Sequence, residues 1–354
     1  MQELYNKWLK QVRKVLPEEP ETRQINFVHL LVGIFFSQRV HLSKIANHML
    51  TRAQRESNVV RLSRFLDNDG VKVDDWYEGY VQGVLASLSK SGAEIRLIVD
   101  GSKIGSSHQL LMIAVAYRRR AIPLVWTWVK HKRGHSSVVV QEKLLKKAKQ
   151  LLPQGTQVSL VGDSEFGHPK LLALLESWSW LYALRQSGRE LYQAQDGAWH
   201  KLNQAIKEGQ FKDLGQVLLT KVHQHKTRLI AHWHKGEKQP WLLATNYPDK
   251  PNCLKAYKCR MWIEEMFGDM KGHGFDIEKT RLRTSAKLNR LTLAVCLLYL
   301  WLVAFGSKVI KAGLRKLVDR KSRRDLSIFR IGFDMALRCL RNSSSLTLFF
   351  TPYP

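Results

Sequence analysis

The sequence predicts an α/β fold in which a mixed sheet is flanked by helices and preceded by a helical domain. Apolar residues recur at helical spacing through residues 1–92. From Ala93 the pattern changes to apolar runs of strand length that alternate with helical segments. With 354 residues, of which 44% are hydrophobic, the chain can bury a substantial core and form two or three structural units.

Residues 1–92 are expected to form a helical N-terminal DNA-binding domain. The segments LYNKWLKQVRKVL, INFVHLLVGIFF and NVVRLSRFLDN place apolar residues on one helix face and basic residues on the others. The segment HLSKIANHML is compatible with one half of a helix-turn-helix. An ordinary helical bundle with solvated charges fits the same residues equally well.

Residues 93–187 are expected to form the first part of the α/β core. EIRLIVDGS predicts a buried strand that ends in an Asp-Gly turn. Two strands are predicted next, HQLLMIAVAY and IPLVWTWV, followed by a helix that serines open, SSVVVQEKLLKKAKQLL. A strand, QVSLVGDSEFG, and a helix with proline in its first turn, HPKLLALLESWSW, come after it. The last segment, LYALRQS, predicts a strand.

The second half of the chain divides into three parts. Residues 188–246 alternate apolar and polar residues, which predicts a β-rich insertion. Residues 247–310 predict the second part of the core, and 311–354 a basic helical C-terminal region. The apolar run from Leu291 to Gly306 is shorter than the roughly 20 residues that a membrane span needs. We therefore expect a buried core helix there, and no membrane partner.

The charge balance predicts a nucleic-acid partner. The chain carries 57 Lys and Arg against 30 Asp and Glu, a formal net charge of +27. Such a charge repels itself unless it meets a polyanion, and its spread along the chain suits DNA. The four cysteines show neither zinc-ligand nor disulfide spacing, and MQELYNKWLKQ has no apolar leader pattern. A reducing cytosol is therefore expected, in association with DNA.

Two carboxylates are expected at one edge of the sheet. Asp100 ends the strand of IVDGS, and Asp163 ends the strand of LVGDSEFG. Active sites of open α/β sheets gather at the carboxyl ends of the strands. Either aspartate alone is also typical of an ordinary turn.

A third carboxylate is expected from AYKCRMWIEEMFGDMKG, residues 256–272. On one continuous helix, Tyr257, Arg260, Glu264 and Lys271 fall within an arc of about 60°. Glu265 lies about 100° from Glu264 by the same geometry and is expected to be a bystander. A surface helix with ion pairs is the alternative.

Three carboxylates from separate elements suggest metal-dependent phosphodiester chemistry. Asp100, Asp163 and Glu264 together could hold two divalent ions about 4 Å apart. Carboxylate oxygens suit Mg²⁺ or Mn²⁺, and the metal charge offsets the repulsion between the acids and a DNA backbone.

The spacing Tyr257-x₂-Arg260-x₃-Glu264-x₆-Lys271 resembles the YREK signature of transposases in the family named after insertion sequence four. The order Asp100, Asp163, Glu264 is similar to that family's DDE triad. The resemblance covers the chain from Ala93 to about residue 340. It implies an RNase H-like fold, a β-rich insertion before the last catalytic helix, and two metal ions held by the triad.

The resemblance also implies an activity and partners. The expected function is cut-and-paste transposition of an insertion sequence: hydrolysis at the transposon ends, then strand transfer of the 3′-hydroxyl, with a hairpin intermediate. The partners would be double-stranded DNA, namely the terminal inverted repeats and the target, and a second copy of the chain in a synaptic complex. The alternatives are a catalytically inactive DNA-binding derivative, and an RNase H-like nuclease without strand transfer.

Further DNA contacts are expected around the triad. By the resemblance, Tyr257, Arg260 and Lys271 hold phosphates. Trp241 either stacks on a flipped base or packs in a hairpin core. Many family members have tryptophan directly after the signature arginine, whereas this chain has Met261 and then Trp262. This departure puts the hairpin step in doubt.

Four more basic or histidine side chains complete the predicted DNA contacts, and they are Arg39, Lys44, Lys103 and His135. The segment HKRGHSSV contains His131 and His135 with serines, but the sequence indicates no aspartate partner for a catalytic triad. Glu165 is expected to be a solvated loop residue.

Overall fold

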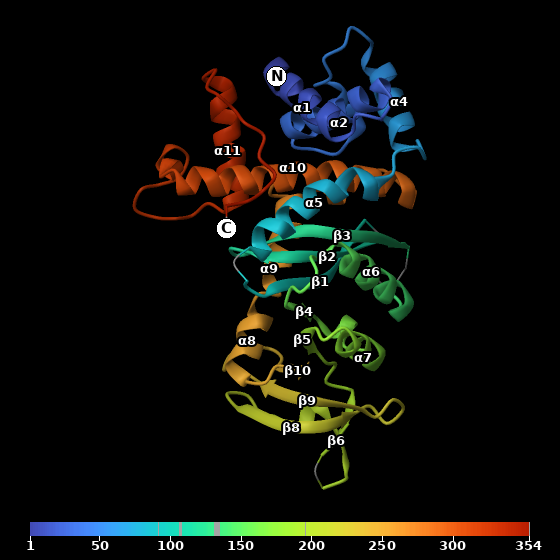
Figure 1. Ribbon diagram of the computed structural model, residues 1–354, viewed down its shortest axis with the longest axis vertical. Coiled ribbons are helices and arrows are strands. Elements are labelled where there is room, and N and C mark those ends of the chain that lie inside the picture. The colour runs from blue at the N-terminus through green and yellow to red at the C-terminus, as the bar shows by residue number, and fades with distance from the viewer. Residues whose placement is uncertain (91, 106–107, 131–134, 195, 354) are drawn as a thin grey trace.

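The computed structural model describes residues 1–90, 92–105, 108–130, 135–194 and 196–353. The molecule is elongated, with the N-terminal helices at one end, the central sheet in the middle and short antiparallel strands at the other end (Figure 1). The helices are α1 Gln2–Val15, α2 Glu21–Ser37, α3 Leu42–Ala46, α4 Arg55–Leu66, α5 Val73–Ser89, α6 Val138–Leu151, α7 Pro169–Ser177, α8 Lys250–Lys258, α9 Met261–Met270, α10 Ser285–Lys311 and α11 Ile328–Arg341. The strands are β1 Ile95–Ile104, β2 His108–Tyr117, β3 Arg120–Lys130, β4 Val158–Gly162, β5 Leu181–Arg185, β6 Leu191–Gln193, β7 Trp199–Lys201, β8 Phe211–Leu219, β9 His225–His232 and β10 Trp241–Thr245.

The ten strands form one mixed sheet in the order β3-β2-β1-β4-β5-β10-β9-β8-β6-β7. β1, β2 and β3 pair antiparallel, while β4 pairs parallel with both β1 and β5. This order of the first five strands is RNase H-like, so the expected fold class is confirmed. The parallel strands β1, β4 and β5 end at the same edge of the sheet, which is where ligands bind in folds of this kind.

The β-rich insertion continues the central sheet. β10 pairs antiparallel with β5, and β9 and β8 follow outward. Main-chain hydrogen bonds therefore join the insertion to the strand beside β4. The expected strands are present, and their attachment places the start of β10 close to the end of β5.

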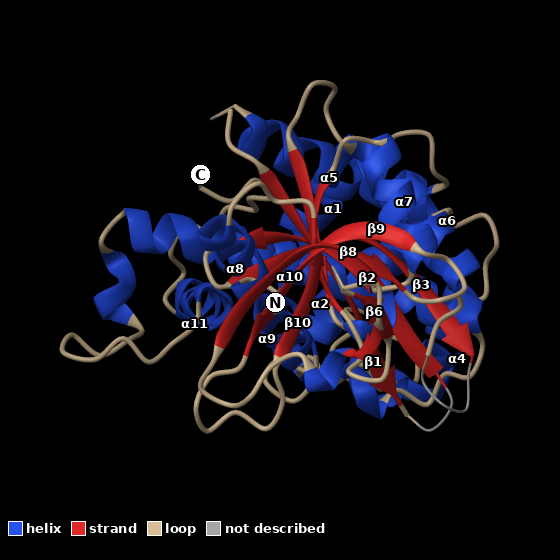
Figure 2. Cartoon of the chain, turned by 90° about the horizontal axis from the view of Figure 1, so that it is seen from below, coloured by secondary structure: helices blue, strands red, loops and turns tan. Residues whose placement is uncertain are grey.

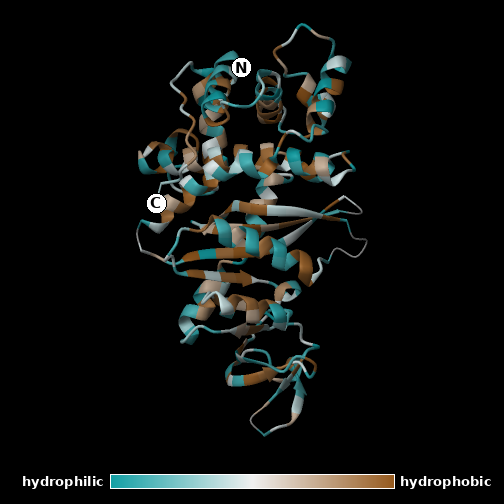
Figure 3. Ribbon diagram, turned by 45° about the vertical axis from the view of Figure 1, so that its right-hand side comes forward, coloured by the Kyte–Doolittle hydropathy of each residue, from teal (hydrophilic) through white to brown (hydrophobic). Residues whose placement is uncertain are grey.

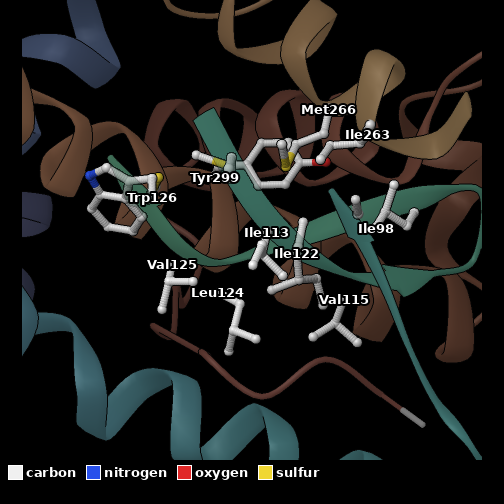
Figure 4. Close-up of a cluster of buried hydrophobic side chains, with 14 of the residues drawn as sticks. Ile98, Ile113, Val115, Ile122, Leu124, Val125, Trp126, Ile263, Met266 and Tyr299 are labelled. Atoms are coloured by element: carbon white, nitrogen blue, oxygen red, sulfur yellow. The ribbon is translucent and has the colours of Figure 1, made fainter. Parts of the chain in front are cut away.

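Helices cover both faces of the sheet. Figure 1 and Figure 2 show α6 and α7 on one side of the strands and α8 on the other. Ile263 and Met266 of α9 lie beside Tyr299 of α10 over one face (Figure 4). Leu124 and Val115 point away from the opposite face. The central strands carry long hydrophobic stretches, whereas the outer helices alternate hydrophobic and hydrophilic residues (Figure 3). This pattern is expected when a sheet is buried on both faces.

The apolar run predicted as a core helix is α10, Ser285–Lys311. It is long and apolar enough to cross a membrane by length and composition, but 89% of its most apolar window is buried inside the protein. It packs against β3, α2, α4, α5 and α11. The prediction of a core helix is therefore confirmed, but the helix has 27 residues, so the argument from a run too short for a membrane was wrong.

The N-terminal helices are anchored to the core through α10. The guanidinium of Arg290 in α10 donates to the carbonyl oxygen of Leu66 at 2.9 Å and pairs with Asp69 at 2.7 Å. α3 is a single short helix of five residues, packed between α2 and α4. At Gly33 of α2, an added Cβ would lie 2.4 Å from the side chain of Ile45, so α2 and α3 approach closely because position 33 is glycine.

Candidate active site

Three carboxylates from three elements meet at the carboxyl edge of the parallel strands. β1 and β4 pair in register, with Val99 opposite Gly162. Asp100 is the next residue of β1, which continues to Ile104 and does not end in the expected Asp-Gly turn, and Asp163 directly follows the last residue of β4. The two aspartates therefore lie at the same level. Glu264 comes from α9, which packs against β1, β2 and β3. The side chains that the sequence pattern grouped by spacing thus come together in space.

A cavity of about 480 Å³ holds these acids together with cationic side chains. Its lining residues are Asp100, Gly101, Ser102, Asp163, Ser164, Arg185, Arg260, Glu264, Phe267, Gly268 and Lys271. Two of the three other residues of the YREK-like pattern, Arg260 and Lys271, therefore lie beside the acids.

The guanidinium of Arg260 lies between two of the acids. Its Nη1 is 3.3 Å from Oδ2 of Asp100, and its Nη2 is 2.6 Å from Oε1 of Glu264. Only 15% of the Arg260 side chain is exposed, so this bridge is screened less than a surface ion pair. Arg260 is the internal counter-charge of the site.

Burial and mutual repulsion dominate the electrostatics of the two aspartates. Burial, followed by the charge of Asp163, raises the pKa of Asp100 to about 7, although Arg260 acts in the opposite direction. Burial also raises the pKa of Asp163, whose Oδ1 accepts a hydrogen bond from the backbone N–H of Glu165 at 2.9 Å. The site concentrates more negative charge than Arg260 alone offsets.

The residues from Tyr257 to Lys271 do not form one continuous helix, so that prediction was wrong. α8 ends at Lys258 and α9 begins at Met261. Between them, the N–H groups of Cys259 and Arg260 bond to carbonyl oxygens three residues back, which makes a tight turn. Lys271 follows the last residue of α9 with φ −88° and ψ −131°, outside the helical region. Arg260 and Glu264 still face each other because they are only four residues apart.

Tyr257 lies beneath the cavity, and Trp241 is its neighbour. Tyr257 is only 2% exposed, and its hydroxyl has no hydrogen-bond partner among the described residues. Its ring meets the ring of Trp241 edge to face at 5.0 Å between centroids. Trp241 also lies 6.1 Å from the ring of His232 in the insertion. Trp241 is therefore part of an aromatic cluster, the packing alternative considered for it, and that cluster adjoins the site.

Glu265 is absent from the cavity lining, but it makes a contact with the sheet that the sequence did not reveal. Its Oε2 lies 3.3 Å from Nη1 of Arg120 on β3. Asp269, one turn later on α9, lies 2.7 Å from Nε of the same arginine. Burial raises the pKa of Asp269 to about 6 despite the neighbouring Arg120. The two acids hold α9 on the sheet in the rotation that turns Glu264 toward Asp100.

Glu165 is not a solvated loop residue either. Its side chain is 11% exposed. Oε1 accepts a hydrogen bond from the backbone N–H of Ser136 at 2.7 Å, and Oε2 accepts one from Nε2 of Gln109 at 3.2 Å. Because the Glu165 N–H also donates to Asp163, this network holds the Asp163 turn against β2 and the start of α6.

The remaining predicted DNA contacts are not in the lining of the acidic cavity. Arg39 pairs with the buried Asp276, which follows α9. Lys44 on α3 and Lys103 on β1 are exposed. Nδ1 of His135 lies 3.7 Å from Oε2 of Glu165. His131 is outside the described residues.

Sequence reasoning missed Arg185. It ends β5, the parallel neighbour of β4, and therefore reaches the same edge as Asp163. Its guanidinium donates to the carbonyl oxygen of Pro240 at 2.9 Å and to Oε1 of Gln239 at 3.2 Å. The signal was available in LYALRQS, since a strand that enters a parallel sheet delivers its last residue to the active edge.

The donors fit a divalent cation in kind, since all three are carboxylates. Among the described residues, no group of three or more His, Cys, Asp or Glu side chains is gathered closely enough to hold one ion. Arg260 accounts for part of this separation, because it pairs with both Asp100 and Glu264. The three carboxylates are nevertheless oxygen ligands of the kind that Mg²⁺ or Mn²⁺ prefers.

The family comparison is consistent with this chemistry. Residues 91–301, more than half of the chain, match the family described as Transposase DDE domain. The chain belongs to this family. A DNA transposase activity follows at the level of the class, as does dependence on divalent metal for cleaving and transferring DNA strands.

Two further comparisons complete the picture. No curated protein sequence matches this DDE transposase. A solved structure described as a piggyBac transposase synaptic complex with hairpin DNA aligns with a TM-score of 0.42 and 8% sequence identity. That alignment covers 98% of this chain and 80% of the other.

Proposed function

We propose that the protein is a cut-and-paste transposase of the family named after insertion sequence four, similar to the transposase of transposon Tn-five. The observation that carries this proposal is the single cavity shared by Asp100, Asp163 and Glu264 with Arg260 and Lys271. The spacing of Arg260, Glu264 and Lys271 in the sequence is that of the YREK signature.

In this proposal, Asp100, Asp163 and Glu264 would hold two Mg²⁺ or Mn²⁺ ions. The metal ions would supply an activated water and charge stabilisation for the leaving oxygen. The chain itself provides the cations that receive the phosphate, namely Lys271 and Arg185 at the cavity wall. Arg260 could turn from the acids to the phosphate once the negative charge of the acids is neutralised.

The strand chemistry would proceed without a covalent protein–DNA intermediate. Water attacks a phosphodiester at the transposon end, and the P–O3′ bond breaks to leave a 3′-hydroxyl and a 5′-phosphate. That 3′-hydroxyl then attacks a phosphodiester of the opposite strand or of the target, which forms one P–O bond and breaks another. Tyr257 is buried, so it would support the site and not act as the nucleophile.

A hairpin intermediate would require a surface for a flipped base. Trp241 is partly exposed and packs on Tyr257, next to the cavity. Met261, which stands where many family members have tryptophan, is 48% exposed, and its Sδ lies 3.1 Å from Nη2 of Arg260. We propose that Trp241 provides the stacking surface and that Met261 fills the space the base leaves.

The proposed partners are double-stranded DNA, both terminal inverted repeats and target, and a second copy of the chain when two ends are paired. The net charge of +27 supports binding to a polyanion. The proposed location is the bacterial cytoplasm, in association with the nucleoid.

The test uses the full chain, Mg²⁺ and a duplex carrying the inverted repeat that flanks its coding sequence, with nicks, hairpins and joined products resolved on a gel. Asp163→Ala should abolish nicking and leave end binding intact, while Asp75→Ala, at an exposed position on α5, should cleave normally. Undiminished cleavage by Asp163→Ala would overturn the assignment. Cleavage by the wild type without any joining would indicate a nuclease, and binding without strand breakage an inactive derivative.

A further inference from the structure

A second groove, distinct from the acidic cavity, lies at the end of the β1–β2 hairpin. It has a volume of about 490 Å³. Its lining residues are Ile104, Gly105, His108, Lys130, Thr280, Arg281, Leu282, Arg283 and Leu288. We call it the TRLR groove, after residues 280–283, which form one of its walls.

The lining of the TRLR groove is cationic. Lys130, Arg281 and Arg283 are exposed, and no described lining residue is an aspartate or glutamate. No ion pair between described residues involves any of these three cations, whereas the neighbouring acids are already paired. Asp276 contacts Arg39 and Lys279, and Glu278 lies 3.9 Å from Lys271.

These three cations therefore keep their charge available for an external anion. Because three separate side chains line one open groove, they suit the repeated phosphates of a nucleic-acid backbone better than a single small anion.

β1 connects the TRLR groove to the acidic cavity. Ser102 lines the cavity, and Ile104, two residues later, lines the groove. The short helical turn Ile277–Lys279, just before Thr280, packs along the same strand. Gly105 lies five residues beyond Asp100 along β1 and its exit, or ~17 Å at ~3.3 Å per residue. One strand of duplex DNA advances ~3.4 Å per nucleotide, so this distance spans about five base pairs.

The other side of the groove adjoins the N-terminal helical domain. Leu288 lines the groove, and the preceding Lys287 lies 3.6 Å from Asp67, just past α4. Nζ of Lys287 also donates to the hydroxyl of Ser63 in α4 at 3.5 Å. The TRLR groove thus lies between the helical domain and the acidic cavity, on a path that DNA held by both would follow.

We infer that the TRLR groove binds the backbone of the transposon-end duplex about five base pairs from the cleaved bond, through Lys130, Arg281 and Arg283. This inference rests on the proposed function. We assign the duplex to the transposon end and not to the target, because a recognised end must reach from the N-terminal helical domain, which we propose binds DNA, to the site of cleavage. The contacts carry no base information, so they position the end without selecting its sequence.

The test measures binding of the full chain to the inverted-repeat duplex over a range of salt concentrations. Each lost phosphate contact lowers the slope of log K against log[salt] by about 0.9. The single variants Lys130→Ala, Arg281→Ala and Arg283→Ala should each lower the slope by about 1, and the triple variant by about 3. Lys143→Ala, an exposed lysine on α6, is the charge-matched control and should leave the slope unchanged.

Position is tested with duplexes in which neutral methylphosphonates replace phosphates at single steps. Substitution about five base pairs from the cleaved bond should weaken wild-type binding and have no further effect on the triple variant. The same substitution in target DNA should not change joining. A normal melting temperature of each variant establishes that it is folded.

Three outcomes overturn the inference. They are an unchanged salt slope in the triple variant, equal sensitivity to methylphosphonates at every position, and a defect confined to target joining. Suppose that the wild type cleaves the end, that Asp163→Ala does not, and that the triple variant binds the end as the wild type does. The groove assignment then fails, while the proposed function stands. If the wild type does not cleave at all, the proposed function itself fails.

Discussion

Replacement of Asp100 by asparagine is expected to stabilise the metal-free protein at neutral pH while it removes DNA cleavage. Asp100 is 8% exposed, and burial with the nearby Asp163 raises its pKa to about 7. Asparagine has the size of the protonated acid and carries no charge to bury. The variant should therefore resemble the folded wild type at low pH, but it would lack a metal ligand.

The magnitude follows from the difference between the folded and unfolded pKa values. An unfolded aspartate titrates at about 3.9, and ~1.4 kcal/mol per pKa unit up to about 7 corresponds to ~4 kcal/mol. Because the folded pKa is the higher one, the native state holds more protons between these values. The free energy of unfolding should therefore fall as pH rises from about 4 to about 7 and stay constant above that.

The assay is chemical denaturation with EDTA across pH 4 to 8, for the wild type, Asp100→Asn and the exposed-site control Asp75→Asn. The free energy of unfolding of Asp100→Asn should equal that of the wild type at about pH 4 and exceed it by ~4 kcal/mol at about pH 7. For a chain of this length, that difference corresponds to a melting temperature higher by ~5 °C. Mg²⁺ should stabilise the wild type and not Asp100→Asn. Equal stability of Asp100→Asn and wild type at pH 8 without metal would refute the reasoning.

Two further substitutions test the surroundings of the site. Arg120→Met should lower the free energy of unfolding by about 3–5 kcal/mol, because it leaves Asp269 buried without its partner. Urea denaturation measures this change. A loss no larger than that of the exposed Arg119→Met would contradict the role given to Arg120. Trp241→Ala should leave first-strand nicking near wild type and reduce hairpin product about 10-fold or more, since stacking contributes about 1–3 kcal/mol per base. The yields of nicked and hairpin DNA are measured on a gel, with Trp233→Ala as the control. A normal hairpin yield for Trp241→Ala would show that Trp241 does not act in hairpin formation.

Short-range sequence patterns predicted those features of the site that depend on residues close together in the chain. Asp163 was placed correctly just past the end of a strand, because an apolar run that stops at a polar turn shows where a buried strand leaves the core. Asp100 was also expected to end its strand, but β1 continues through it to Ile104 because this stretch pairs with β2. The spacing from Arg260 to Glu264 also survived the tight turn between α8 and α9, since four residues span about one helical turn whether or not the helix continues. Lys271 reached the cavity although it lies outside the helix on which its position was argued.

Contacts between distant segments were not visible in the sequence. Glu265 could not be assigned a role by helix geometry, because its partner Arg120 is 145 positions away and is brought close only by the packing of α9 on β3. Glu165 was expected to be solvated because it follows a predicted strand end in a loop. It is enclosed by Gln109 and Ser136, which arrive from β2 and from the start of α6.

By itself, the sequence determined the α/β class, the order of the three acids and the burial of the apolar helix, which is longer than the apolar run that predicted it. These properties depend on composition and on short-range periodicity, which folding preserves. Only the tertiary structure decided that Arg185 joins the site, that Arg260 bridges Asp100 and Glu264, and that the TRLR groove opens beside β1. Those facts depend on strand order and helix packing, which bring together residues whose separation along the chain carries no information about their distance in space.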